Sequence, residues 1–285
     1  MMGSQRIGLV TNAASGSNDE KTLAELKACC GDAGFVVDRA LSFPDRPLPT
    51  GSQLDAAEIG LVAVFAGDGT VNALIGALSG WGGAVLVLPG GTMNLLFHRL
   101  HGDRTTAEVI RLAGSGKAER TRPGIVRCSA GTATADLLAG PGTSWHAVRE
   151  SMREADLLAV AASTAQALGA TLAAPGVACR GPECLAASDY PLIMLTPTGE
   201  GMRMSGFRAE TAGDYIEGGL AVLQRRFREG PHDDLGVARQ VTLASTTGEP
   251  IPLLLDGESA QGAAEEVFRL VPCGVDLLAT RADGR

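Results

Sequence analysis

Three short apolar runs in the first part of the chain are each followed by small polar residues and then by a helical pattern. The runs lie at 7–10, 62–66 and 84–88, and the first helical pattern extends from about Lys21 to Cys30. Apolar runs of this length are typical of strands that are buried on both faces. Their alternation with helices predicts a doubly wound, parallel α/β sheet, whose ligand site lies at the carboxyl ends of the strands.

The pattern changes near 121–124, where a locally basic stretch ends at Pro123 and shorter strands follow between glycines, prolines and charged residues. The strands predicted in this second part are 125–128, 191–195, 219–223, 237–243, 251–255 and 267–271. We therefore expect an α/β domain over 1–122 and a β-rich domain over 123–285, with the last residues able to pack back on the first domain.

An uncharged stretch from Leu157 to Ala178 has the length of a membrane span. Polar residues dilute it and Pro175 ends it early, so we interpret it as an Ala-rich core helix that begins near Ser144. The first residues contain no positively charged segment followed by a long apolar core, which argues against a secretory signal. We expect a cytoplasmic protein.

Two glycine-rich turns carry the candidate chemistry. The segment V-A-V-F-A-G-D-G-T-V-N (62–72) places Gly67 and Gly69 between a strand and a helix, where backbone N–H groups can approach an anion. The carboxylate of Asp68 would repel bound phosphates unless a cation lay between them, so it indicates Mg²⁺ and phosphoryl transfer. The alternative is a strand-to-helix turn in which Asp68 caps the helix. P-G-G-T at 89–92 repeats the device, with an ordinary βα loop as its alternative.

A pair of acidic residues, Asp256 and Glu258, follows the apolar run 252–255 in the motif D-G-E. A strand that ends there would present the two carboxylates as a pair on one face. A partly desolvated carboxylate in this position can take a proton from a hydroxyl group while its neighbour orients it. By itself D-G-E is also a common hairpin turn, which is the alternative interpretation.

Four motifs in order resemble the diacylglycerol kinase catalytic family, which includes sphingosine kinases and soluble bacterial lipid kinases. They are N-x-x-S-G (12–16), G-D-G-T-x-N (67–72), P-x-G-T-x-N (89–94) and D-G-E (256–258). The resemblance implies a nucleotide-binding α/β domain, a C-terminal β-sandwich, and ATP with Mg²⁺ in the cleft between them. It implies that Asp68 organises Mg²⁺ and that Asp256, beside Glu258, accepts the proton of the lipid hydroxyl. The residues that it implies for the nucleotide are Asn12, Ser15, Gly16, Gly67, Gly69, Thr70, Asn72, Gly91, Thr92 and Asn94.

The chain also departs from that family pattern. Ala66 stands where the family usually has Gly, Ala13 where it has Pro, and Ala73 and Leu95 where it has acidic residues. The departures at Ala66, Ala73 and Leu95 motivate one rival interpretation, a non-catalytic nucleotide or lipid binder.

A second rival is an NAD kinase-like enzyme. T-P-T-G (196–199) resembles part of the second signature of NAD kinases, although the Ser-Thr-Ala-Tyr continuation is missing. The retention of both Asp68 and Asp256 speaks against the non-catalytic binder, and D-G-E with N-x-x-S-G favours the lipid kinase over the NAD kinase.

The composition limits the classes of function further. A net charge of −8 and an aromatic content of 4% argue against nucleic-acid binding. The six cysteines form no disulfide or zinc pattern, so we expect reduced, mostly buried thiols, and the four histidines show no ligand spacing. We therefore predict an ATP- and Mg²⁺-dependent kinase that phosphorylates a hydroxyl of a diacylglycerol-like or sphingoid-like lipid. It would act peripherally at the inner membrane surface. The sequence does not determine its oligomeric state, and a homodimer is one alternative.

Overall fold

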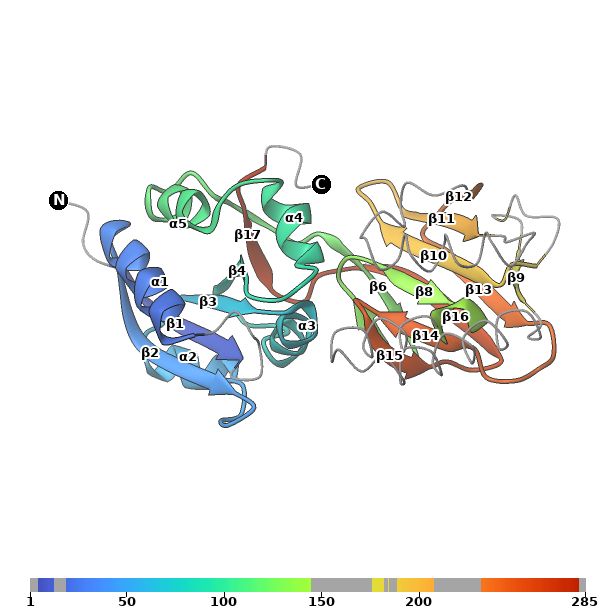
Figure 1. The fold of residues 1–285 in the computed structure, drawn as a ribbon, viewed down its shortest axis with the longest axis horizontal. Helices are drawn as coiled ribbons and strands as arrows, with labels where there is room; N and C mark the ends of the chain where they lie inside the picture. The colour runs from blue at the N-terminus through green and yellow to red at the C-terminus, as the bar shows by residue number, and fades with distance from the viewer. Residues whose placement is uncertain are drawn as a thin grey trace. The chain divides into compact units, whose positions relative to one another are not determined.

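The computed structural model describes residues 5–12, 19–144, 176–181, 184, 189–207 and 232–281. The chain divides into two compact units, of which unit 1 comprises Met1–Gly124 and Pro272–Arg285 and unit 2 comprises Ile125–Val271 (Figure 1). The strand predicted at 219–223, the helix predicted from Ser144 and nearly all of the uncharged stretch lie outside the described residues.

Unit 1 is built on one sheet with the strand order β2-β1-β3-β4-β17-β5. Its first four strands and β17 run parallel, and β5 pairs antiparallel with β17 at one edge. The bounds are β1 (Gln5–Asn12), β2 (Phe35–Phe43), β3 (Leu61–Ala66), β4 (Ala84–Pro89), β5 (Glu119–Thr121) and β17 (Asp276–Ala279). The chain proceeds from β1 to one side and returns to the other side with β3, so the switch point lies between β1 and β3. This confirms the predicted doubly wound α/β sheet.

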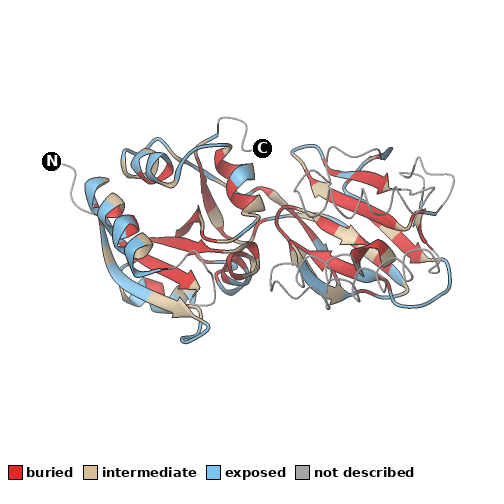
Figure 2. Cartoon of the chain, viewed as in Figure 1, coloured by how far each residue is buried: buried red, intermediate tan, exposed pale blue. Residues whose placement is uncertain are grey.

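Helices cover both faces of this sheet. Figure 1 shows α1 and α5, which contact each other, on one side and α2 and α3 on the other. The bounds are α1 (Glu20–Asp32), α2 (Gly51–Ala56), α3 (Asp68–Ala77), α4 (Leu95–His101) and α5 (Thr106–Gly114). Every residue of β3 is buried as a result, which explains why this strand is a continuous apolar run rather than an alternating one (Figure 2).

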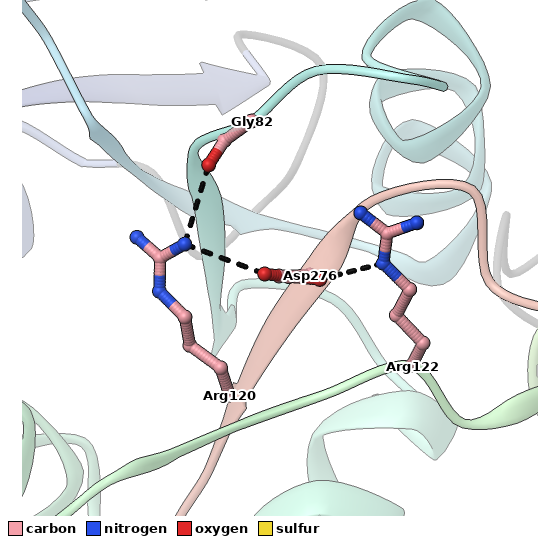
Figure 3. Close-up of polar contacts among 4 residues, drawn as sticks. All are labelled: Gly82, Arg120, Arg122 and Asp276. Atoms are coloured by element: carbon pink, nitrogen blue, oxygen red, sulfur yellow. Dashed lines mark hydrogen bonds and ion pairs between the residues drawn. The ribbon is translucent and has the colours of Figure 1, made fainter.

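An ion-pair cluster in unit 1 joins β17 to the edge strand and its continuation (Figure 3). Arg122 donates from Nε to Asp276 Oδ1 at 2.6 Å, and Arg120 Nη1 lies 3.3 Å from Asp276 Oδ2 and 3.2 Å from the carbonyl oxygen of Gly82. A backbone hydrogen bond joins the same two segments, because Cys273 donates from its N–H to the carbonyl of Pro123 at 2.9 Å. These contacts fix the C-terminal strand of unit 1 although its sequence follows the whole of unit 2.

Unit 2 consists of two sheets, whose strand orders are β12-β11-β10-β8-β14-β15 and β7-β6-β16-β13-β9. Buried residues of both sheets, such as Leu195 and Leu253 from one and Val126 and Phe268 from the other, belong to a single hydrophobic cluster. The bounds are β6 (Gly124–Cys128), β7 (Gly131–Ala133), β8 (Leu137–Ala139), β9 (Val177–Arg180), β10 (Leu192–Pro197), β11 (Met202–Phe207), β12 (Asp233–Ala238), β13 (Gln240–Ser245), β14 (Pro252–Leu255), β15 (Glu258–Gln261) and β16 (Glu265–Pro272). Two sheets around one core confirm the predicted β-sandwich.

One predicted strand of unit 2 is wrong. The run 237–243 is divided at Arg239, because β12 pairs with β11 in one sheet whereas β13 pairs with β9 and β16 in the other. An apolar run shows that residues are buried, but both sheets face the same core, so the run does not show where the chain changes sheets.

The cysteine prediction also needs correction. Cys179 and Cys184 form a disulfide with a Cα–Cα distance of 5.9 Å. Gly181 follows β9 with φ of +113° and accepts a hydrogen bond from the N–H of Cys184, which returns the chain toward Cys179. Cys30, Cys128 and Cys273 are buried free thiols, as expected, and Cys29 is half-buried. None of the helices in the described part of the chain is long and apolar enough to cross a membrane.

His101 is buried under the end of β17. Its side chain is 0% exposed, and Nδ1 lies 3.0 Å from Oγ1 of Thr280. Burial lowers the pKa of His101 to about 4. The imidazole is therefore a neutral part of the core of unit 1 at neutral pH.

Replacement of His101 by Gln should reduce the acid sensitivity of the protein. Between the unfolded pKa of 6.5 and the folded pKa of about 4, the unfolded chain binds more protons, so wild-type stability falls as pH falls through this range by up to about 3 kcal/mol. Urea titrations of the wild type and His101→Gln at pH 7 and pH 4.5 would measure this loss in the free energy of unfolding. His98→Gln, an exposed histidine on the same helix, is the matched control; equal pH dependence in all three proteins would contradict the assignment.

Replacement of Asp276 by Asn should loosen the attachment of β17. The carboxylate is partly shielded and serves two guanidinium groups, so we expect a loss of about 1 kcal/mol in the free energy of unfolding that shrinks at high salt. Asp38→Asn breaks the more exposed Arg6–Asp38 pair and should cause no measurable change. Equal effects in the two variants would show that the cluster around Asp276 adds no more to the free energy of unfolding than an exposed ion pair does.

Candidate nucleotide site and acidic hairpin

The two glycine-rich turns of unit 1 contact each other at the carboxyl ends of β3 and β4. Gly90 donates from its N–H to the carbonyl of Ala66 at 3.2 Å. A Cβ added to Gly90 would lie 2.5 Å from the backbone N of Ala66, and one added to Gly91 would lie 2.4 Å from Cα of Gly67. No side chain fits between backbones this close. Gly90 and Gly91 are therefore needed for the two turns to meet.

Asn94 holds the second turn in shape. Its Oδ1 accepts a hydrogen bond from the N–H of Gly91 and its Nδ2 donates to the carbonyl of the same residue, both at 2.9 Å. The backbone of Asn94 is left-handed, with φ of +51°, a conformation that Asn tolerates better than most residues. The position predicted to line the nucleotide thus uses its amide to shape the turn.

Asp68 connects the first turn to the helix that follows the second. It is 8% exposed, and its Oδ1 accepts a hydrogen bond from the N–H of Leu96 in the first turn of α4 at 3.3 Å. Burial raises the pKa of Asp68, while backbone hydrogen bonds from the start of α4 oppose this. The alternative interpretation had Asp68 capping its own helix, α3. In the structure its side chain caps α4 instead. A carboxylate at a helix N-terminus is also favoured by the helix dipole.

Asn12 brings the end of β1 to the same place. Its Nδ2 donates to Oγ1 of the buried Thr70 at 2.8 Å, which spans the switch point between β1 and β3. Of the other residues predicted here, Asn72 is half-buried and Thr92 is exposed. Ser15 and Gly16 lie outside the described residues.

The arrangement fits a phosphate group. The N-cap of α3, Gly67, is extended and makes no side-chain capping bond, so the first N–H groups of a helix of ten residues point out at the carboxyl end of the sheet. For a divalent cation, the described ranges hold no group of three or more His, Cys, Asp or Glu side chains that could bind it. Asp68 is the only carboxylate among the predicted site residues of unit 1 that the structure describes, so a cation would take further oxygen ligands from phosphates.

The departures from the family pattern have different structural meanings. Ala66 lies within β3 and is not among the non-glycine residues with positive φ in the described part of the chain, so it fits the strand without strain. Ala73 is exposed on α3, and Leu95 is a half-buried residue at the start of α4. At the two glycine-rich turns the departures therefore remove acidic side chains without straining the backbone at Ala66, and Ala13 lies outside the described residues.

In unit 2 the D-G-E motif forms a tight hairpin. Leu255 of β14 pairs with Glu258 of β15, so Asp256 and Gly257 make up a two-residue loop. Their φ angles are +51° and +93°, as in a type I′ turn. Asp256 is buried and Glu258 is exposed, so the two carboxylates do not form the pair on one face that the sequence predicted. The chain reverses between them.

Asp256 is surrounded by hydrogen-bond donors. Its Oδ2 accepts from the N–H of Thr134 at 2.6 Å and from Oγ1 of Thr134 at 2.7 Å. Its Oδ1 accepts from the N–H groups of Ala135 and Asp136 at 2.8 and 3.1 Å. Burial raises the pKa of Asp256 to about 6, although these four bonds favour the charged form.

Sequence reasoning missed the partners of Asp256. Thr134 and Asp136 lie more than a hundred residues earlier in the chain, and Oδ1 of Asp136 also accepts a hydrogen bond from Oγ1 of Thr196 at 2.8 Å. No motif marks them in a single sequence. Thr196 begins the T-P-T-G segment, whose Thr198 donates from Oγ1 to the carbonyl of Gly201 within the β10–β11 turn. Thr196 and Pro197 are the last residues of β10, and Thr198 and Gly199 begin the turn to β11.

Comparisons with known proteins agree with this architecture. Residues 6–126 match the model of the diacylglycerol kinase catalytic domain. The fold resembles the crystal structure of a diacylglycerol kinase from Bacillus anthracis strain Sterne, with 14% identity, a TM-score of 0.61 and 98% of each chain covered. Two further structures from that strain, described provisionally as diacylglycerol kinases, have 16% identity, TM-scores of 0.63 and 0.65 and the same coverage. No curated protein matches the chain.

Replacement of Gly91 by Ala should destabilise unit 1, because the added methyl group must displace the backbone of Gly67. We expect a loss of roughly 1–3 kcal/mol in the free energy of unfolding, measured by urea titration. Gly76→Ala, on α3 with no atom within 4 Å of the new Cβ, is the control and should be neutral or stabilising. If Gly91→Ala were equally harmless, the two turns would not be in the contact described.

Proposed function

From a chain that carries a diacylglycerol kinase catalytic domain at residues 6–126, we propose an ATP-dependent lipid kinase. It transfers the γ-phosphoryl group of ATP to a hydroxyl of a diacylglycerol-like or sphingoid-like lipid. The observation that carries the proposal is the contact between the two glycine-rich turns at the carboxyl ends of β3 and β4. The first turn of α3, which starts at this contact and has no side-chain cap, suits a polyphosphate.

In the proposed complex the phosphates lie at the start of α3. Gly67, Gly69 and Thr70 cradle them from the first turn of the helix, where the N–H groups have no side-chain cap. Asn12 orients the hydroxyl group of Thr70. Asn94 contributes through the shape that it gives the turn at Gly91, and Thr92, Asn72, Ser15 and Gly16 complete the proposed nucleotide site.

Asp68 is the proposed protein ligand for Mg²⁺. Its Oδ1 is held by the N–H of Leu96, so the carboxylate is fixed before any ligand arrives. Bound Mg²⁺ neutralises charge on the transferring phosphoryl group. Because the described residues offer no cluster of further acidic or histidine ligands, we expect the cation to bind together with the nucleotide rather than before it.

The lipid acceptor is the least constrained part of the proposal. It is supported by the family of the matched domain and by the description of one solved structure of similar fold as a diacylglycerol kinase. Acyl chains are recognised by apolar shape rather than by a short motif. The proposed action at the inner membrane surface requires only peripheral binding.

The decisive assay follows labelled γ-phosphate from ATP, with Mg²⁺, to lipids in mixed micelles, with NAD as a parallel acceptor. Label in an organic-phase product is the expected result and would identify the acceptor class. Label in NAD alone would favour the NAD kinase-like alternative. No label despite measurable ATP binding would favour a non-catalytic binder, with Ala73 and Leu95 as the first positions to restore to acidic residues.

Two substitutions at Asp68 separate its metal role from its capping role. Asp68→Asn keeps an oxygen that can accept the bond from Leu96 but removes the charge, so thermal stability should persist while turnover falls by a hundredfold or more. Asp68→Ala removes both, so stability should fall as well by about 1 kcal/mol. Calorimetry with ATP, with and without Mg²⁺, completes the test. Mg²⁺-dependent affinity that is unchanged in Asp68→Asn would exclude the metal role.

A further inference from the structure

The chain leaves unit 1 and returns to it through two segments, 120–124 and 272–276, which we call the paired linkers. They are bonded to each other, because Cys273 donates from its N–H to the carbonyl of Pro123 at 2.9 Å. Both of these residues are buried. The more exposed ion pairs of Asp276 with two arginines join the same segments (Figure 3). The paired linkers therefore form one element within unit 1.

Arg99 connects the paired linkers to helix α4. It is half-buried, and its Nη1 donates to the carbonyl of Gly124 at 2.9 Å. A hydrogen bond from a charged donor is stronger than one between neutral groups. Burial raises the pKa of the Cys273 thiol, whereas the charges of Arg122 and Arg99 lower it. Arg99 is therefore bonded to one linker and lies near the other.

The start of α4 is bonded to the candidate nucleotide site. The Oδ1 atom of Asp68 accepts from the N–H of Leu96 at 3.3 Å. Asn94, the N-cap of α4, holds the turn at Gly91 in shape. Leu96 and Arg99 are three residues apart, which is less than one helical turn and about 4.5 Å along the axis. A displacement at the start of α4 therefore reaches Arg99 almost directly.

The packing of α4 in unit 1 does not need the charge of Arg99. The C-terminal end of the helix is held at the carbonyl of Leu100, which accepts from the N–H groups of Thr280 and Arg281. The buried residues of the helix are Leu96, Phe97, Leu100 and His101. A neutral side chain at position 99 would leave all of these contacts in place. What Arg99 adds is therefore the connection to the paired linkers.

We propose that Arg99 is a positioning residue that couples the nucleotide site to the paired linkers. Asp68 and the first turn of α3, once they hold Mg²⁺ and phosphates, restrain α4 through Leu96, and α4 restrains the linkers through Arg99. This coupling rests on the proposed function because it needs a nucleotide at this site, but it needs no lipid acceptor. Coupling between two sites is reciprocal. A loosened linker should therefore weaken nucleotide binding in turn.

The N–H of Cys273 reports directly on the paired linkers, because it exchanges with solvent only when its bond to Pro123 opens. In the wild type, a saturating concentration of MgATP should slow this exchange by roughly fivefold or more. Hydrogen exchange followed by NMR, with MgATP binding verified by calorimetry, is the measurement. An exchange rate that bound MgATP leaves unchanged would overturn the proposal.

Arg99→Gln removes the charge that joins α4 to Gly124. At saturating MgATP it should reduce the slowing of Cys273 exchange to less than about twofold, and the Kd for MgATP should rise several-fold. Arg104→Gln is the matched control, because Arg104 donates from Nη1 to the carbonyl of His101 at the end of the same helix. This control should keep the full response of the wild type.

A merely structural bond would give a different result. Arg99→Gln would then speed the exchange of Cys273 equally with and without MgATP, and the Kd for MgATP would stay unchanged. That result would overturn the coupling. Arg99→Met provides a second variant in case Arg99→Gln does not fold, because it keeps an apolar stem at this half-buried position. A full response to MgATP in folded Arg99→Met would also overturn the proposal.

The lipid assay separates this proposal from the proposed function. A protein that binds MgATP and slows the exchange of Cys273 through Arg99, but labels no lipid, would reject the lipid kinase and support the coupling. Label in lipid without any effect of MgATP on Cys273 would reject the coupling alone. A wild-type protein that binds no MgATP would overturn both.

Discussion

The contact between the turns at Gly67 and Gly91 is the constraint on which the rest of unit 1 depends. Two parallel strands, β3 and β4, end at the same edge of the sheet, and their turns can meet only because Gly90 and Gly91 carry no side chain. Asp68 and Asn94 then fix the geometry, one across the two turns and one within the second. The polar side chains of the motifs thus mainly hold the backbone in shape. The backbone in turn places the first N–H groups of α3 at the end of the sheet.

Unit 2 uses its motif in a similar way. Asn94 and Asp256 share a left-handed backbone and side-chain bonds to the main chain of a nearby segment. Among the residues that the structure describes, only Glu58 joins them as a non-glycine residue with positive φ. Such conformations cost free energy and persist where the surroundings determine them. Their occurrence in two of the four motifs shows that these motifs encode local geometry as strongly as chemistry.

The sequence predicted the α/β half well because buried strands and glycine turns leave local signals. Val62 to Ala66 could be interpreted as a strand from its apolar run, and Gly67 as a turn from its neighbours. The features that the sequence did not predict depend on distant rather than local residues. The division of 237–243 between two sheets, the disulfide of Cys179 and the partners of Asp256 all depend on pairing across the fold. A residue type in a single sequence carries no record of such distant neighbours.

The late position of β17 in the chain has a consequence for how the protein is made. This strand lies between β4 and the edge strand β5 in the first sheet, although all of unit 2 separates it from both in sequence. Synthesis proceeds from the N-terminus, so the sheet of unit 1 cannot be closed until the sequence of unit 2 has been translated. In the interval β4 has a free edge toward the missing strand, and such edges favour aggregation. The nascent first unit should therefore depend on chaperones longer than its own length would suggest.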